Sequence, residues 1–294
     1  MSPKDVDQTG SSECPSLTAI GSCRITNPLR MATEAGLVEL NGQGVYGYTH
    51  SSAEAVQLAR YLLGDLEIPD MARPLVMPGT DQPPSNPAHT PSDLYLVELS
   101  SAKEVRMGSI LVQLNYLTRH FEEFFSDKER TRAFWRLAKG DREAEKRAFL
   151  QATPSFQALS FEDQARLQLI TQRPVQEESL RKDIRWLQDT LPRTAFVTHC
   201  DALKPDGTPL TSRASYIAMT KEALTQEGAV FSDPTALMRQ VGQSKALKDE
   251  AGSLSHYTDD FEAMLFDHWW RDMLASALLG GTAEPSGAQS QRSA

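Results

Sequence analysis

Cys23 is the residue of this sequence whose type and position best suit covalent chemistry. It lies between an apolar run at residues 17–20 and a helix-start signal at Asn27 and Pro28. Gly21 permits a tight turn, free N–H groups at the coming helix favour a thiolate, and strand ends of α/β folds form the ligand crevice. The spacing predicts a nucleophilic thiol at a strand-to-helix turn. A buried structural cysteine is the competing interpretation, because free cysteine is among the most buried residue types.

The six histidines are the candidate bases for this thiol, and their surroundings narrow the choice. Three of them lie in a proline-rich loop or inside amphipathic helices, where a core or surface role is the ordinary interpretation. His50, His199 and His256 remain, all near the ends of expected elements. His256 lies in a loop that enters the last helix, and a loop histidine can swing to a thiol. All three histidines therefore remain candidate bases.

Polar residues beyond the expected strand at residues 94–99 form a second group. Because side chains just past the carboxyl end of a central strand face the same crevice as the nucleophile, Ser100, Ser101 and Lys103 are predicted to line the site with oxyanion donors. Ser22 and Arg24, which flank the cysteine, are predicted to bind substrate or the oxyanion. A simpler role stays open for the serines, which can cap a helix beginning near Ala102.

Composition restricts the classes of partner. The net charge is −9 with a pI near 5.2, and no Lys/Arg cluster stands out, so nucleic acid is not an expected partner. No stretch approaches the roughly 18 apolar residues of a membrane span, and residues 1–16 lack a secretory pattern, so we expect a cytoplasmic protein with no membrane partner. Cys14, Cys23 and Cys200 lack paired spacing, which suggests neither a disulfide framework nor a metal site.

Short apolar runs that alternate with capped helices predict an α/β fold with a parallel sheet of about five strands and helices on both faces. The expected domain covers residues 16–279, with a disordered leader at 1–15 and a disordered tail at 280–294. Residues 107–191 have helical periodicity and no evident strand, so they are predicted to form a helical insertion. The expected strands lie near residues 17–20, 45–48, 94–99, 195–199 and 229–231.

These features resemble the SGNH/GDSL hydrolase superfamily. The resemblance is carried by the strand that ends in Gly-Ser-Cys at residues 21–23, the first strand-helix unit, the Asp-Gly turn at residues 206–207 and the histidine before the last helix. It is closer to the cysteine variants, the GSCFA and WcbI-like groups, in which Gly-x-Cys replaces Gly-Asp-Ser. The resemblance implies a flavodoxin-like three-layer sandwich, with Cys23 as nucleophile and His256 as base. It covers roughly residues 16–65, 93–105 and 194–275.

The sequence departs from that family at two places. Ser253 stands where these enzymes usually carry an Asp before the histidine, so an orienting carboxylate must come from Asp249, Glu250 or Asp259. The usual Gly-x-Asn-Asp block is missing, and residues 100–103 take its place.

The reaction implied is attack of the thiolate on an acyl carbonyl to form an acyl-enzyme at Cys23. The substrate is expected to be a small-molecule or carbohydrate ester or thioester, and the acyl group can pass to water, a hydroxyl or an amine. No cofactor is required, although WcbI-like relatives imply coenzyme A as a possible acyl donor. Two other classes stay open: a non-catalytic SGNH-like binding or scaffold protein, and a nucleotide-binding α/β protein, against which the lack of a glycine-rich fingerprint counts.

Overall fold

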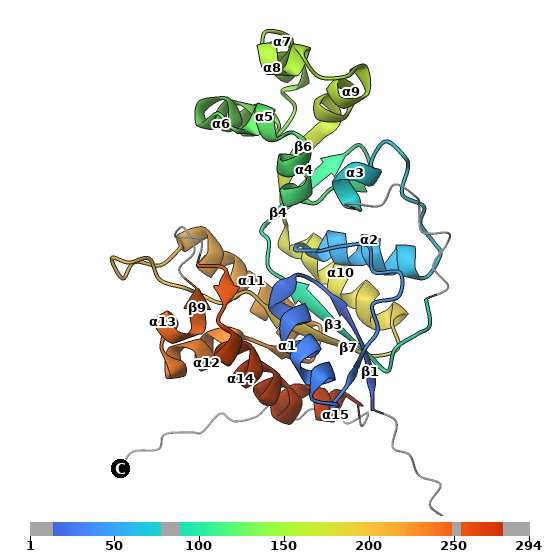
Figure 1. Cartoon of the computed structure of the whole chain (residues 1–294), viewed down its shortest axis with the longest axis vertical. Helices are drawn as coiled ribbons and strands as arrows, with labels where there is room; N and C mark the ends of the chain where they lie inside the picture. Colours follow the sequence, from blue (N-terminus) through green and yellow to red (C-terminus); the bar gives the residue numbers. More distant parts are fainter. Residues whose placement is uncertain (1–13, 78–88, 249–253, 279–294) are drawn as a thin grey trace, which may run out of the picture.

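The computed structural model describes residues 14–77, 89–248 and 254–278. Its main sheet has five strands, all parallel, in the order β2-β1-β3-β7-β8 (Figure 1). That order is the flavodoxin-like doubly wound arrangement, whose ligands bind beside the first strand where the strand order reverses. The predicted fold class is confirmed. The strands are β1 (Ser16–Ile20), β2 (Glu39–Leu40), β3 (Leu94–Leu99), β7 (Thr194–Thr198) and β8 (Phe231–Ser232).

Helices cover both faces of the sheet, as predicted. Along β3, Leu94 and Leu96 pack into one buried cluster while Tyr95, Val97 and Leu99 pack into the other, since successive side chains of a strand point to opposite faces. All six residues of β3 are buried, which is typical of a central parallel strand. One face carries α1 (Cys23–Glu34), α12 (Pro234–Val241) and α14 (Asp259–Trp269); the other carries α2 (Ser52–Leu62), α10 (Glu177–Thr190) and α11 (Thr211–Gln226).

Helix α1 begins earlier than the sequence signal at Asn27 and Pro28 indicated. Ser22 is its N-cap, and the Ser22 hydroxyl accepts the Arg24 N–H at 3.3 Å. Asn27 lies inside the helix, and Pro28 is buried there. Cys23 is therefore the first helical residue rather than part of a longer turn.

The predicted strand at residues 45–48 is wrong. The second strand of the sheet is β2, which pairs with the start of β1, and residues 45–48 follow it without strand pairing. Gly44 has a φ of 78°, which breaks an extended run. The Tyr48 N–H donates to the Tyr116 hydroxyl at 3.1 Å instead of to a neighbouring strand.

The prediction that residues 107–191 contain no strand is also wrong, as is the helix expected near Ala102. The chain leaves β3 and forms an antiparallel sheet in the order β5-β4-β6. Gly108, with a φ of 62°, closes the short hairpin between β4 and β5. Strand β6 is not adjacent in sequence, so local periodicity did not reveal the pairing. These strands are β4 (Lys103–Met107), β5 (Ile110–Leu111) and β6 (Ile170–Pro174).

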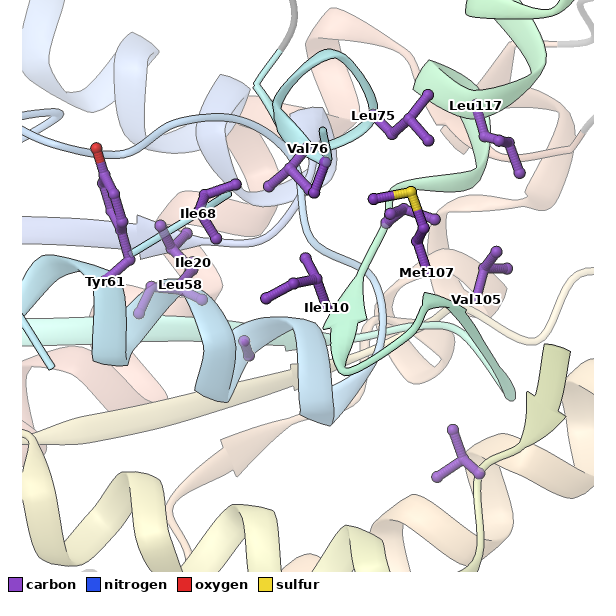
Figure 2. Packing of buried hydrophobic residues seen from close by; sticks show 14 of the residues in the cluster. Ile20, Leu58, Tyr61, Ile68, Leu75, Val76, Val105, Met107, Ile110 and Leu117 are labelled. Carbon is purple, nitrogen blue, oxygen red and sulfur yellow. The ribbon is translucent and has the colours of Figure 1, made fainter. Parts of the chain in front are cut away.

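The remainder of this insertion is helical, as predicted, and forms the part of the molecule that stands beyond β4 and β6 in Figure 1. Its core is continuous with that of the main sheet: Figure 2 shows Ile20 and Leu58 in one buried cluster with Met107 and Leu117. The helices are α4 (Leu114–His120), α5 (Glu122–Phe125), α6 (Lys128–Leu137), α7 (Glu143–Gln151), α8 (Pro154–Gln157) and α9 (Phe161–Leu169).

The predicted disordered tail at 280–294, most of the predicted leader and the candidate carboxylates Asp249 and Glu250 lie outside the described residues. No helix in the described ranges is long and apolar enough to cross a membrane. The short elements are α3 (Arg73–Val76), α13 (Gln243–Ala246), the antiparallel pair β9 (Leu247–Lys248) and β10 (His256–Tyr257), a π-helical segment (Trp270–Leu274) and α15 (Ala275–Leu278).

Candidate active site

Cys23 lies at the carboxyl end of β1, where the strand order reverses between β1 and β3. The turn before it requires glycine, because a Cβ on Gly21 would lie 2.6 Å from the Cβ of Glu98 and 2.6 Å from Cδ1 of Ile25. Such distances force a shift of backbone or core. The glycine that the sequence suggested for a tight turn thus allows the close approach of β3 to the cysteine turn.

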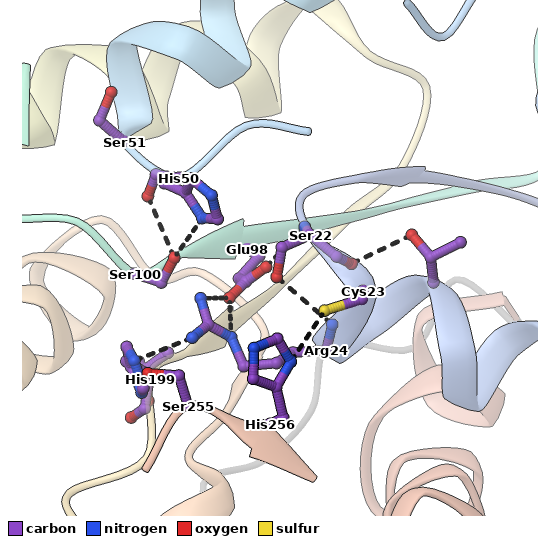
Figure 3. A network of polar contacts seen from close by, with 12 residues as sticks. Ser22, Cys23, Arg24, His50, Ser51, Glu98, Ser100, His199, Ser255 and His256 are labelled. Atoms are coloured by element: carbon purple, nitrogen blue, oxygen red, sulfur yellow. Dashed lines mark hydrogen bonds and ion pairs between the residues drawn. The ribbon is translucent and has the colours of Figure 1, made fainter. Parts of the chain in front are cut away.

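A buried ion pair between Arg24 and Glu98 supports this turn (Figure 3). Glu98 is 1% exposed, and its carboxylate accepts the Ser22 N–H at 2.7 Å and Nε of Arg24 at 2.6 Å. Arg24 also donates through Nη1 to Nε2 of the buried His199 at 2.9 Å. Burial opposes ionisation of Glu98, but Arg24, His50 and Ser22 together hold the pKa of that carboxyl below its usual value. Ser22 and Arg24, which were predicted to bind substrate, are both buried and bonded within the protein.

The predicted approach of Cys23 and His256 is confirmed. Sγ of Cys23 lies 3.9 Å from Nδ1 of His256, although the two residues are 233 positions apart in sequence. Figure 3 shows the imidazole beside the thiol at the start of α1. The contact is long, as nucleophile–base hydrogen bonds often are without substrate. At this distance the pair stands at the outer limit of a hydrogen bond to sulfur.

The helix N-terminus led us to expect a lowered pKa for the Cys23 thiol, but its pKa is raised instead. Burial raises the pKa of the Cys23 thiol; Arg24 opposes this effect, while Glu98 and Glu262 add to it. A thiol held in its protonated form needs a base to become a nucleophile. The Cys23 N–H has no acceptor in the part of the chain that the structure describes, so it is free to donate to a developing oxyanion.

His256 is carried by the two-residue strand β10, which pairs with β9. Arg213 on α11 holds the segment before it, donating to the Leu254 carbonyl at 2.9 Å and to the Ser255 hydroxyl at 3.4 Å. Leu254 has a φ of 45°, which is uncommon for a residue with a side chain. The candidate orienting carboxylate Asp259 instead accepts from Lys248 at 2.9 Å. Within the described ranges, no carboxylate bonds to His256.

The serines beyond β3 lie against His50. The N–H groups of Ser100 and Ser101 donate to the His50 carbonyl at 2.8 and 2.9 Å, and the Ser100 hydroxyl lies 3.4 Å from Nδ1 of His50. Their backbone donors are therefore occupied, and their oxyanion role stays a prediction. Lys103 begins β4 and lines a separate cavity in the insertion, whose lining does not include Cys23.

Two features of the site were missed from the sequence. Glu98 was visible as the one charged residue in the apolar run of β3, and a charge in a central strand signals a buried partner. Arg213 carried no such signal, because its role depends on how α11 packs against a distant loop. The described residues contain no group of three or more His, Cys, Asp or Glu side chains placed to hold a metal ion.

Comparisons with known proteins relate the chain to polysaccharide biosynthesis proteins. The Vi polysaccharide biosynthesis protein TviD of Salmonella typhi is 36% identical over 247 residues, which cover 83% of this chain and 30% of that protein. The chain thus spans less than a third of the relative's length. Among solved structures, LAE5, an α/β hydrolase from the metagenome of Lake Arreo, Spain, aligns over 92% of this chain and 97% of its own, with 9% identity and a TM-score of 0.40. That score is too low to establish a common fold.

A family model described as the TviD N-terminal domain matches residues 15–272. Neither this model nor the curated relative names the SGNH/GDSL superfamily or its GSCFA and WcbI-like groups, so that resemblance remains a prediction. The family match includes β1, the cysteine turn, β3 and the strand that carries His256. The chain belongs to the TviD N-terminal domain family.

Proposed function

We propose that the protein is a cysteine-dependent acyltransferase or acyl hydrolase that forms an acyl-enzyme at Cys23, with His256 as the base. The contact between Cys23 and His256 at the ligand-binding edge of the sheet carries this proposal. Because the pKa of the Cys23 thiol is raised, the proposed reaction requires a neighbouring base, and His256 is in place to supply it. The resemblance to cysteine variants of the SGNH superfamily agrees with the same two roles.

The proposed reaction has two steps. His256 takes the thiol proton at Nδ1 while Sγ forms a bond to the acyl carbonyl carbon. The resulting oxyanion accepts a hydrogen bond from the backbone N–H of Cys23. The tetrahedral intermediate collapses with loss of the thiolate or alkoxide leaving group, which takes the proton from His256. Water or a substrate hydroxyl then attacks the acyl-enzyme, gives its proton to His256 and releases the Cys23 thiol.

We propose a carbohydrate as the acyl acceptor or as the ester substrate. The relative TviD is a Vi polysaccharide biosynthesis protein, and sugar hydroxyls are natural partners for an acyl-enzyme. The proposed donor is an acyl thioester, such as that of coenzyme A, because exchange between two thioesters is nearly isoenergetic.

A non-catalytic binding module is the second candidate. It is favoured by two observations: the pKa of Cys23 is raised, and no carboxylate in the described ranges bonds to His256. Such a module would bind substrate at the same edge of the sheet without acylation of the thiol.

Intact-mass spectrometry separates these candidates. The protein is incubated with acetyl, propionyl and butyryl thioesters of coenzyme A, and the modified residue is identified by peptide mapping. Cys14→Ala serves as the background, because Cys14 is exposed and open to unspecific acylation, whereas Cys200 is buried. The proposal requires a single adduct on Cys23 that is lost in Cys23→Ala. Binding of the thioesters without an adduct on Cys23 would favour the binding module.

A further inference from the structure

The insertion contains a cavity that has no part in the proposed acyl transfer. It lies between strands β4 and β6 and the connection from α6 to α7, with a volume of about 680 Å³. Cavities of roughly 300–1,000 Å³ are typical of sites for small molecules and cofactors. Cys23 and His256 are not among its lining residues.

Four basic side chains line this cavity: Lys103, Lys139, Lys146 and Arg173. None of the four forms an ion pair with a carboxylate in the described ranges, although the whole protein carries a net charge of −9. Three of them are exposed and one, Lys146, is buried, so the cluster combines solvated charges with a charge that lies inside the protein.

Lys146 gives this cluster its best-defined donor. It is 4% exposed, and its ammonium donates to the Ile170 carbonyl at 2.8 Å. A lysine ammonium has three donors, and the described residues supply one acceptor for them. The buried Lys146 ammonium has a single carbonyl as its partner, so an anion bound in the adjoining cavity would stabilise its charge. Two carboxylates, Asp141 and Glu143, also line the cavity, and the charge of Glu143 acts to raise the pKa of Lys146, so the lining holds two more cations than carboxylates.

We propose that this cavity binds an anionic ligand with carboxylate or phosphate groups, of the size of a short acidic oligosaccharide or a sugar phosphate. The four cations supply the charge complement, and the cavity exceeds what a single small ion fills. Strand β4, whose Lys103 lines the cavity, follows β3 in the chain after Ser100 and Ser101. The proposal does not depend on the acyl-transfer function.

Isothermal titration calorimetry on the full chain tests the site with three probes: trigalacturonate, inorganic phosphate and the neutral trisaccharide maltotriose. The test variant replaces the exposed cations, Lys103→Gln, Lys139→Gln and Arg173→Gln, and leaves the buried Lys146 in place. The matched control removes the same charge elsewhere, with Lys128→Gln, Arg132→Gln and Lys182→Gln, all exposed residues outside the cavity. Circular dichroism melting establishes that both variants fold.

We expect one of the two anions to bind the wild type, and the cavity variant to lose at least about tenfold in affinity, because it lacks three of the four charged donors of the lining. The control variant should stay within about twofold of wild type. Tight binding of trigalacturonate alone identifies a carboxylated sugar, and binding of phosphate identifies a phosphorylated ligand. Absence of binding by both anions, equal loss in the two variants or equal affinity for maltotriose would overturn the proposal. Cys23→Ala should bind as wild type does, which keeps this result separate from the catalytic one.

Discussion

The two sides of the candidate active site are built in opposite ways. Cys23 stands on a capped helix, above a carboxylate that is 1% exposed and fully bonded to its surroundings. His256 is exposed and stands on a two-residue strand, whose approach is held by Arg213 from another helix. The first side is part of the core, and the second is attached to its surface.

Because of this difference, we expect substitutions on the two sides to affect different quantities, the free energy of unfolding on one side and the reaction rate on the other. Substitutions on the Cys23 side disturb a buried ion pair, so their main cost is in the free energy of unfolding. Substitutions on the His256 side remove a base or shift it relative to the thiol, so their main cost is in rate. The following predictions test whether the two effects separate in this way.

His256→Gln should have the largest effect on rate. Loss of a general base typically lowers turnover by about 10²–10⁴-fold, so acyl-adduct formation on Cys23 should fall by that order. The free energy of unfolding should change by no more than about 0.5 kcal/mol, because the side chain is exposed. Timed intact-mass spectra and urea unfolding measure the two quantities. Unchanged acylation would show that His256 is not the base.

Glu98→Gln should have the largest effect on stability. It leaves the buried Arg24 guanidinium without its carboxylate, which costs about 3–5 kcal/mol. Glu129→Gln is the control, because Glu129 forms an exposed pair with Arg132 and should change stability by less than about 1 kcal/mol. Urea unfolding of both variants checks this. Equal effects would mean that the buried pair does not support the cysteine turn.

Glu54 on α2, next to the His50 segment, gives the stability of the fold a pH dependence. Glu54 accepts the His50 N–H at 2.6 Å, and burial raises its pKa to about 7 from an ordinary value of 4.5. Because the folded state holds this proton more tightly, the contribution of Glu54 to stability is full below pH 4.5 and declines as the pH rises to about 7, by at most about 1.4 kcal/mol per unit. Glu54→Gln should lack this decline. Parallel stability profiles for the two proteins would contradict the prediction.

Arg213→Met should lower stability by more than His256→Gln and less than Glu98→Gln, and it should still slow acylation. It removes the contacts to Leu254 and Ser255, worth about 1–3 kcal/mol, and leaves His256 less precisely placed. Arg239→Met is the control. The Arg239 side chain is 65% exposed, pairs with Asp201 and forms no ion pair or hydrogen bond with the described residues of the His256 segment. If the two variants acylate Cys23 equally fast, Arg213 does not position the base.

The sequence predicted the parts of the molecule that depend on local pattern. The buried run of β3, the capped helices and the turn at Gly21 each have a signature within a few residues. The approach of His256 to Cys23 was also predicted, from the pairing of a nucleophile with a loop histidine and from the resemblance to the SGNH superfamily.

The parts that were missed depend on distant pairing. Strand β6 pairs with β4 across the whole helical insertion, and residues 170–174 show no alternation that would reveal a strand. The raised pKa of Cys23 arises from burial and from Glu98 and Glu262 on other elements, which the helix-start signal alone does not contain. Both the pairing of β6 and the raised pKa of Cys23 thus arise from tertiary packing, which the local sequence pattern does not contain.

The most direct test of the Cys23–His256 pair is the rate of iodoacetamide alkylation of Cys23, mapped by peptide mass spectrometry across pH, in wild type and in His256→Gln. Because burial raises the pKa of the thiol and His256 is the base that takes its proton, the account predicts that the rise in alkylation rate moves to higher pH when the imidazole is removed. Profiles that superimpose for the two proteins would show that His256 does not act on the thiol, and would contradict the central claim.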